Sequence, residues 1–321
     1  MTDELRSICD EHGIFLRREA IALGYDDRAL HRAMKARQIH RVRHGAYVFG
    51  DQWQPLDETA RHLLTARAVL RTAHSAMALS HTTALIAMGA PLWDLPLDDV
   101  HTTRLDGRAG RREAGVAQHR GRVLPGDVTE IADMPVTSAV RTALDMTRIV
   151  DVEHSLVSMD WLLHTKALDK PELRSRAAAM NLSPGTLATD LTIRLADGRL
   201  ESVGESRSNY LFWRGGLPKA EPQYTVYDER GNLFARVDFA WAAYGVFLEF
   251  DGKVKYEKYR REGESVVDTI LREKKREETI CRLTGWRCIR IVWADLYKPE
   301  GTIAHIRGVL DGGPVHGQRI G

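Results

Sequence analysis

The first 50 residues change from a helical to an alternating pattern of apolar positions. Apolar residues recur at helical spacing up to residue 37, with Gly13 and Gly24 as breaks, which predicts three short helices. An aspartate at position 26 or 27 is expected to cap the third helix, Asp27–Arg37. Two β-like runs lie on either side of His44-Gly45 and predict a hairpin. We therefore expect a small N-terminal domain over residues 1–55.

The third helix and the hairpin carry a basic block in a chain whose total charge is nearly balanced. The whole chain has 46 Lys plus Arg against 44 Asp plus Glu, whereas residues 28–50 hold six Lys or Arg, three His and no acid. A helix with basic side chains on one face can enter the major groove of DNA, while basic wing residues meet the flanking phosphates. The pattern therefore predicts a winged helix-turn-helix, and a solvated basic helix on a small α/β cap is the alternative. The candidate DNA-binding residues are Arg28, Arg32, Lys35, Arg37, Arg41 and Arg43.

Residues 56–195 mix helical and strand-like patterns and are expected to form an α/β connecting domain. We expect apolar helices near Glu58–Thr72 and Met77–Met88, and another helix after Ser138. Short strands are expected around Val100–Thr103 and Val116–His119. The chemistry of this region indicates no function by itself.

Four of the histidines of this region and two of its serines are polar residues that could carry chemistry. The histidines lack a ligand spacing such as HxxxH, so we expect structural or surface roles for them rather than a metal site. The serines, Ser80 and Ser138, are expected to cap helices. The four histidines are His74, His81, His101 and His119.

The last third of the chain follows turn residues within 181–198 and is expected to form a separate domain, residues 196–321. Its pattern predicts a helix, three strands, a charged helix and a further strand. This αβββαβ order is that of the restriction-endonuclease core, so the fold class that we expect for the chain is α+β with several domains. The predicted elements are Glu201–Trp213, Glu221–Tyr227, Phe234–Trp241, Val246–Phe250, Glu264–Leu283 and Cys288–Trp293.

Two carboxylates of this domain lie inside apolar strand patterns, where an unpaired charge is costly. Asp238 and Glu249 fall on neighbouring predicted strands, which would bring them together across a hairpin, and Glu205 of the preceding helix could add a third carboxylate. Hydrolysis of a phosphodiester at neutral pH needs a divalent metal, and Mg²⁺ or Mn²⁺ takes oxygen ligands of this kind. The three residues are therefore candidate metal ligands, with solvated strand carboxylates as the alternative.

Residues 200–297 resemble the PD-(D/E)XK nucleases, and within them the group related to very-short-patch repair endonucleases. The resemblance rests on Val237-Asp238-Phe239, on Leu248–Gly252, and on a helix with Glu273–Glu277 that leads into Gly285–Arg290. It implies a Mg²⁺-dependent endonuclease in which the strand carboxylates hold the metal and act in catalysis.

One position departs from the pattern of that family. Asp251 stands where the motif E-x-K has its lysine, so another cation must stabilise the charge that develops on the phosphate. Lys253 and Lys255 are close in the chain. Lys274 is expected on the apolar face of its helix together with Glu277, as an inward pair that is either part of the catalytic site or a buried structural ion pair.

The N-terminal pattern resembles a second family. The helical pair that runs into Arg41–Tyr47 is similar to the N-terminal domain of the AbiEi-type antitoxins, which implies DNA binding, often at the protein's own promoter. Ser80–Leu85 and Pro135–Asp145 resemble the connecting domain that follows such a helix-turn-helix. DNA is therefore the expected partner, and a cognate toxin, a second protein or an oligomer of this chain would be compatible with the resemblance.

Composition narrows the cellular setting. Three cysteines without CxxC spacing indicate neither a disulfide framework nor a zinc site and fit a reducing cytoplasm. The most apolar stretch, Phe239–Phe250, is too short to span a bilayer, and the first residues lack the pattern of a secretion signal. We therefore expect a cytoplasmic protein that uses no membrane.

Two functions fit these patterns. The leading hypothesis is a DNA endonuclease of host defence or repair, in which the winged helix supplies DNA affinity and the last domain cleaves. The alternative is a non-catalytic, antitoxin-like transcriptional regulator whose nuclease fold is degenerate. An RNA-cleaving or toxin role also stays open, because nothing in the motif separates DNA from RNA.

Overall fold

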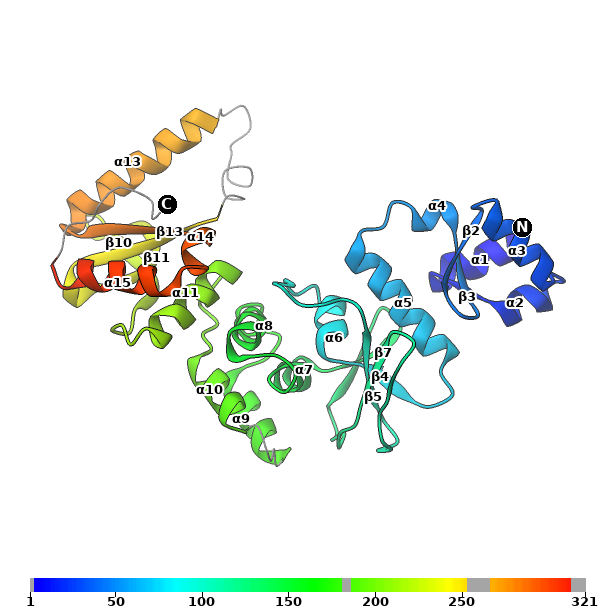
Figure 1. Cartoon of the computed structure of the whole chain (residues 1–321). Coiled ribbons are helices and arrows are strands. Elements are labelled where there is room, and N and C mark those ends of the chain that lie inside the picture. The colour runs from blue at the N-terminus through cyan, green and yellow to red at the C-terminus, as the bar shows by residue number, and fades with distance from the viewer. Residues whose placement is uncertain (1–2, 181–185, 253–265, 313–321) are drawn as a thin grey trace. The chain divides into compact units, whose positions relative to one another are not determined.

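The computed structural model describes residues 3–180, 186–252 and 266–312 (Figure 1). The chain divides into two compact units. The first comprises Met1–Ser158 and Ala167–Asp190, and the second comprises Met159–Lys166 and Leu191–Gly321. The first unit therefore holds the basic N-terminal segment together with most of the region 56–195.

The N-terminal elements form a winged helix. The predicted helices and hairpin are present, and the sheet has the order β1-β3-β2 because a two-residue strand, which the pattern did not predict, pairs with β3. Asp26 caps the third helix by accepting a hydrogen bond from the backbone N–H of Ala29 at 2.7 Å. Leu5, Phe15 and Leu30 lie in the core between helices and sheet. The elements are α1 (Asp3–His12), β1 (Phe15–Leu16), α2 (Arg17–Ala22), α3 (Asp27–Lys35), β2 (Ile39–Arg43) and β3 (Ala46–Phe49).

A long helix, α5 (Glu58–Thr72), joins the winged helix to the rest of the first unit after the short helix α4 (Gly50–Trp53). Ala68 of α5 belongs to the winged-helix core, whereas Ala66 and Val69 belong to the core of the following sheet. Arg71 of α5 forms an ion pair of 2.5 Å with Glu19 of α2. The winged helix and the sheet are therefore packed on opposite sides of one helix.

The middle of the first unit is a six-stranded mixed sheet with the order β6-β7-β5-β4-β9-β8. The predicted helix over Met77–Met88 is wrong in its first part, because Met77–Leu79 forms a central strand that pairs with β5 and β9, and the helix begins only at His81. A short buried apolar run fits either structure, so its pattern alone cannot decide. The elements are β4 (Met77–Leu79), α6 (His81–Ala87), β5 (Val100–Arg104), β6 (Arg112–Glu113), β7 (Val116–His119), β8 (Val128–Ile131), β9 (Met134–Thr137) and α7 (Ala139–Met146), followed by α8 (Val152–His164), α9 (Lys170–Ala179) and α10 (Thr186–Leu195).

The second unit contains the predicted order of helix, three strands, helix and strand. Its sheet has the order β10-β11-β12-β13, in which the first three strands are antiparallel and β13 runs parallel to β12. Phe239, Leu248 and Ile289 lie in the core on one side of this sheet. Two C-terminal helices, which the pattern did not predict, complete the unit. The elements are α11 (Val203–Arg214), β10 (Glu221–Tyr227), β11 (Leu233–Trp241), η1 (Ala242–Tyr244), β12 (Val246–Asp251), α13 (Val266–Thr284), β13 (Arg287–Val292), α14 (Trp293–Leu296) and α15 (Pro299–Leu310).

The cysteines and the apolar character of the helices can also be read from the structure. Cys9, Cys281 and Cys288 are free thiols. Among the helices of the described ranges, none is both long and apolar enough to cross a membrane.

Candidate functional site

Helix α3 presents a continuous basic face to solvent. Arg28, Arg32 and Lys35 recur at helical spacing and are all exposed, while Leu30 and Ala33 point into the winged-helix core. Among the residues that the structure describes, no acid forms an ion pair with any of these three cations. Their positive charges are therefore available to an anionic partner.

The acid at the start of α3 does not neutralise this face. Asp27 is held by Arg17 of α2, whose guanidinium donates two hydrogen bonds to its carboxylate at 2.7 and 2.6 Å. The side-chain hydrogen bond from Arg17 lowers the pKa of Asp27. Asp27 therefore links α3 to α2 instead of neutralising the cations of α3.

The remaining predicted DNA-binding residues divide into two groups. Arg37, two residues after the end of α3, and Arg41 of β2 are exposed. Arg43 at the end of β2 is half-buried, and burial lowers its pKa. It lines a cavity of about 460 Å³ that Arg104 and Arg111 of the neighbouring sheet region also line. Arg43 therefore faces the middle of the first unit rather than standing free on the wing.

The three carboxylates predicted as metal ligands are buried in the second unit, on the elements that the sequence indicated. Asp238 of β11, Glu249 of β12 and Glu205 of α11 are 8%, 7% and 4% exposed. A carboxylate oxygen of Asp238 accepts a hydrogen bond from the backbone N–H of Phe250 at 2.7 Å. This bond joins β11 to β12 beside Glu249.

Glu205 lies close enough to Asp238 for their charges to interact. Its carboxylate accepts hydrogen bonds from the Ser202 hydroxyl and from the Gln223 amide, both at 2.6 Å. Burial, and next the charge of Asp238, raise the pKa of Glu205. A cation bound between these two buried carboxylates would reduce the electrostatic repulsion between them.

Two arginines, which the sequence reasoning did not select, hold the other acids of this cluster. Arg276 of α13 forms an ion pair of 3.0 Å with Glu249 and donates to the carbonyl oxygen of Arg236 at 2.7 Å. Arg290 of β13 lies 3.6 Å from Asp251. Strands β12 and β13 are parallel with Glu249 opposite Arg290, and this pairing places a cation near the position where the family motif has its lysine.

The predicted inward pair of Lys274 and Glu277 is wrong. Lys274 is exposed, and Glu277 forms an ion pair of 2.6 Å with Arg290 instead. Ile280 of α13 is buried, and at helical spacing its face carries Arg276 and Glu277 but excludes Lys274. Lys253 and Lys255, the other two candidate cations, lie outside the described residues.

The structure does not gather the acids into a closed ligand set. A group of three or more His, Cys, Asp or Glu whose ligand atoms all lie within 4.8 Å of one another could hold a metal ion. Within residues 3–180, 186–252 and 266–312, such a group consists of histidines and includes none of the acids of the second unit. Glu249 is engaged by Arg276, so a metal at this cluster would compete with that arginine for the carboxylate.

Of the four histidines singled out in the sequence, three come together in the fold, although no ligand spacing in the chain indicated this. His81 begins α6, His101 lies on β5 and His119 ends β7, and their ligand atoms all lie within 4.8 Å of one another. Strands β5 and β7 are paired with His101 opposite Ala117, so His119, two residues further, lies on the same face of the sheet as His101. The fourth, His74, is exposed and lies outside this cluster.

The sequence alone did not reveal this histidine cluster, because its three members are 18 to 38 residues apart in the chain. Histidines on two predicted strands were the available signal, since His101 lies within Val100–Thr103 and His119 ends Val116–His119. Burial lowers the pKa of all three, that of His119 to about 4. The imidazoles are therefore neutral near pH 7.

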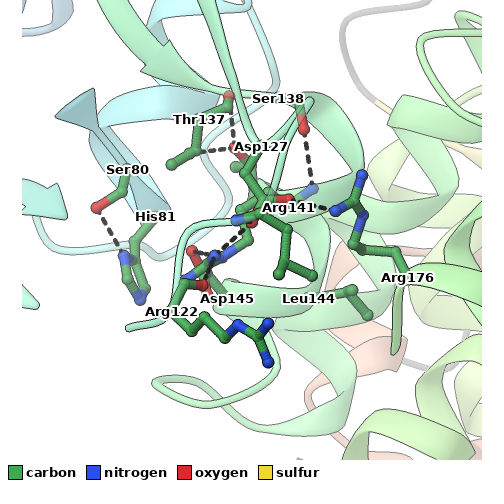
Figure 2. A network of polar contacts seen from close by, with 12 residues as sticks. Ser80, His81, Arg122, Asp127, Thr137, Ser138, Arg141, Leu144, Asp145 and Arg176 are labelled. Carbon is green, nitrogen blue, oxygen red and sulfur yellow. Dashed lines mark hydrogen bonds and ion pairs between the residues drawn. The ribbon is translucent and has the colours of Figure 1, made fainter. Parts of the chain in front are cut away.

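The segment Pro135–Asp145 builds a buried ionic network rather than an open site (Figure 2). Arg141 of α7 donates hydrogen bonds to Asp145 at 2.9 Å and to Asp127 at 2.8 Å, and these three side chains are at most 2% exposed. Arg176 of α9 approaches the second oxygen of Asp127 at 3.2 Å. These contacts tie α7 and α9 to the loop that precedes β8.

The two serines predicted as helix caps differ. The hydroxyl of Ser138 accepts a hydrogen bond from the backbone N–H of Arg141 at 3.4 Å and so caps α7. Ser80 occupies the corresponding position before α6, but its hydroxyl bonds to Nδ1 of His81 at 2.9 Å instead of the helix backbone (Figure 2). Its side chain therefore orients a histidine.

A comparison with known proteins covers the segment that holds the basic face of α3. Residues 4–50 match a family described as "Transcriptional regulator, AbiEi antitoxin". The match spans the winged helix from α1 to the end of β3 and includes all of the basic face on α3. No curated protein matches the chain.

Proposed function

We propose that this protein is a DNA-binding, antitoxin-like transcriptional regulator that contacts DNA through the basic face of α3. The observation that carries the proposal is the exposed row of Arg28, Arg32 and Lys35, which lies within the segment that matches the regulator family. A cognate toxin or a second copy of the chain would be its protein partner.

The geometry supports this function physically. Helix α3 follows α2 across the short turn that contains Gly24, and its apolar side is anchored in the core by Leu30. Its polar side can therefore enter the major groove while Arg41 of β2 meets the phosphate backbone. Each phosphate that a cation neutralises releases counterions, so binding of this kind depends strongly on salt.

The test is to replace Arg28, Arg32 and Lys35 together by alanine in the full-length chain. We expect DNA affinity at about 0.1 M salt to fall about 10- to 100-fold, and the slope of log K against log salt to shrink by up to about 2.7. Fluorescence anisotropy with duplex DNA from the protein's own promoter region, measured in EDTA, gives both quantities.

The matched control removes the same charge elsewhere. Arg174 of α9, Arg214 of α11 and Lys219, which follows α11, are exposed and lie outside the winged helix, and alanine at all three should leave the salt slope nearly unchanged. Equal loss of affinity in both triple variants would mean that net charge rather than the face of α3 governs binding, and the proposal would fail.

A second candidate function, favoured by the buried acids of the second unit, is divalent-metal-dependent cleavage of DNA. The αβββαβ element order and the position of Asp238 and Glu249 on adjacent antiparallel strands support it. Glu205, Asp238 and Glu249 supply the hard oxygen donors that Mg²⁺ prefers, and the repulsion between the first two favours a bound cation. Such an ion would supply charge stabilisation at the phosphate.

In this candidate function the protein's own cations also have roles. Arg276 would hold Glu249 in place, and Arg290 would supply the positive charge that the motif lysine gives in the resembled family. Incubation of supercoiled plasmid with the full-length protein and Mg²⁺ or Mn²⁺ tests it. We expect nicking that EDTA stops, whereas promoter binding should continue in EDTA.

A further inference from the structure

The histidine cluster of the first unit has the geometry of a metal site. Nδ1 of His101 and Nε2 of His119 face each other at 2.9 Å, and the ligand atom of His81 lies within 4.8 Å of both. A tetrahedral ion with bonds of about 2.0 Å holds its nitrogen ligands roughly 3.3 Å apart. Small side-chain rotations would therefore bring all three nitrogens onto one ion.

The position of His81 gives a second, independent observation. Its backbone has φ of 52°, in the left-handed region that residues other than glycine rarely adopt. Strain of this kind persists where the surroundings enforce it, and it concentrates at functional sites. Nδ1 of His81 is hydrogen-bonded to the Ser80 hydroxyl at 2.9 Å, and in the tautomer in which Nδ1–H donates to that oxygen, Nε2 has a free lone pair and is the ligand atom (Figure 2). Outer hydrogen bonds commonly orient metal-binding histidines in this way.

We propose that His81, His101 and His119 form a binding site for one divalent transition-metal ion, with Zn²⁺ as the best-suited ion. Three neutral imidazoles favour Zn²⁺, Cu²⁺ or Ni²⁺ over the hard ions Mg²⁺ and Ca²⁺. In the described part of the chain, no fourth histidine, cysteine or acid joins the three. His101 and His119 are partly exposed, so a water molecule can take the fourth position.

The charges near the cluster are of both signs: Arg148 acts on His81 and His119, whereas Asp99 and Arg112 act in opposite senses on His101. Arg141 lies close enough to influence His81, but it is committed to Asp127 and Asp145, whose two carboxylates outweigh its single charge. The competing explanation is a purely structural cluster that holds no ion. In it, the rings of His81 and His119 stack with their centroids 3.7 Å apart, and His101 is hydrogen-bonded to His119.

Metal binding by the full-length protein separates the two explanations. Protein stripped with chelator is loaded with Zn²⁺, dialysed and assayed for bound metal, and the affinity is measured by calorimetry. A parallel titration with Co²⁺ follows the visible absorption of a tetrahedral site. We expect about one ion per chain, an intense Co²⁺ absorption and a higher melting temperature with Zn²⁺.

The variants His101→Gln and His119→Gln change partly exposed residues and should fold, which circular dichroism would check. We expect each to weaken Zn²⁺ binding at least 10-fold and to abolish the Co²⁺ absorption, while His74→Gln, an exposed histidine outside the cluster, keeps both. Absence of metal binding by the wild-type chain would overturn the proposal. So would unchanged affinity in the folded variants, because the ion would then occupy other residues. Neither result depends on DNA binding through α3.

Discussion

Replacement of Glu249 by Gln or of Asp238 by Asn is expected to lower metal-dependent plasmid cleavage about 10²- to 10³-fold. Both substitutions keep the size of a buried side chain but remove the negative charge that a divalent ion needs in its oxygen ligands. The measurement is the initial rate of nicking in Mg²⁺ or Mn²⁺, with promoter affinity in EDTA recorded for the same preparations. Promoter affinity should stay within about twofold, because the basic face of α3 is untouched.

The control for these variants is Glu278→Gln on α13, which removes an exposed carboxylate of the same unit. It should cleave like the wild type. If Asp238→Asn and Glu249→Gln also cleaved at the wild-type rate, these acids would not form the cleavage site. The ion pairs of Glu249 with Arg276 and of Asp251 with Arg290 would then be structural contacts, and the regulator function would stand alone.

Removal of the guanidinium of Arg141 is expected to cause the largest loss of stability. Arg141→Ala leaves the carboxylates of Asp127 and Asp145 buried beside a cavity, and breaking a buried ion pair from one side costs about 3–5 kcal/mol. Burial lowers the pKa of Arg141, but the carboxylates of Asp145 and Asp127 raise it by more. The guanidinium therefore stays protonated and paired with both acids. Chemical denaturation at pH 7 measures the change in the free energy of unfolding.

An exposed ion pair of the same region provides the comparison. Arg111 lies 3.2 Å from Glu113, and both side chains are largely exposed, so Arg111→Ala should change the unfolding midpoint only slightly. A loss below about 1 kcal/mol in Arg141→Ala would contradict the stabilising role of the buried network. The buried position of Arg141 would then need an explanation other than the stability of the first unit.

Predictions from local periodicity were largely correct. The basic face of α3, the hairpin around His44-Gly45 and the strands that carry Asp238 and Glu249 depend on neighbouring residues, whose spacing determines which side of a helix or strand they share. The prediction of which side of α13 faces inward was wrong. Taking Cys281 rather than Ile280 as the inward position turned the helix enough to place Lys274 inside and to miss Arg276.

The sequence by itself determined the three helices and the hairpin of the winged helix, its run of basic residues without an acid between them, and the order of elements around the buried acids. These features follow from short-range spacing and side-chain chemistry. Only the tertiary structure decided which cations meet Glu249 and Asp251, that Arg141 is buried between two aspartates, and that His81, His101 and His119 meet. Each of these contacts depends on strand pairing or on packing between elements distant in the chain, which no local period encodes.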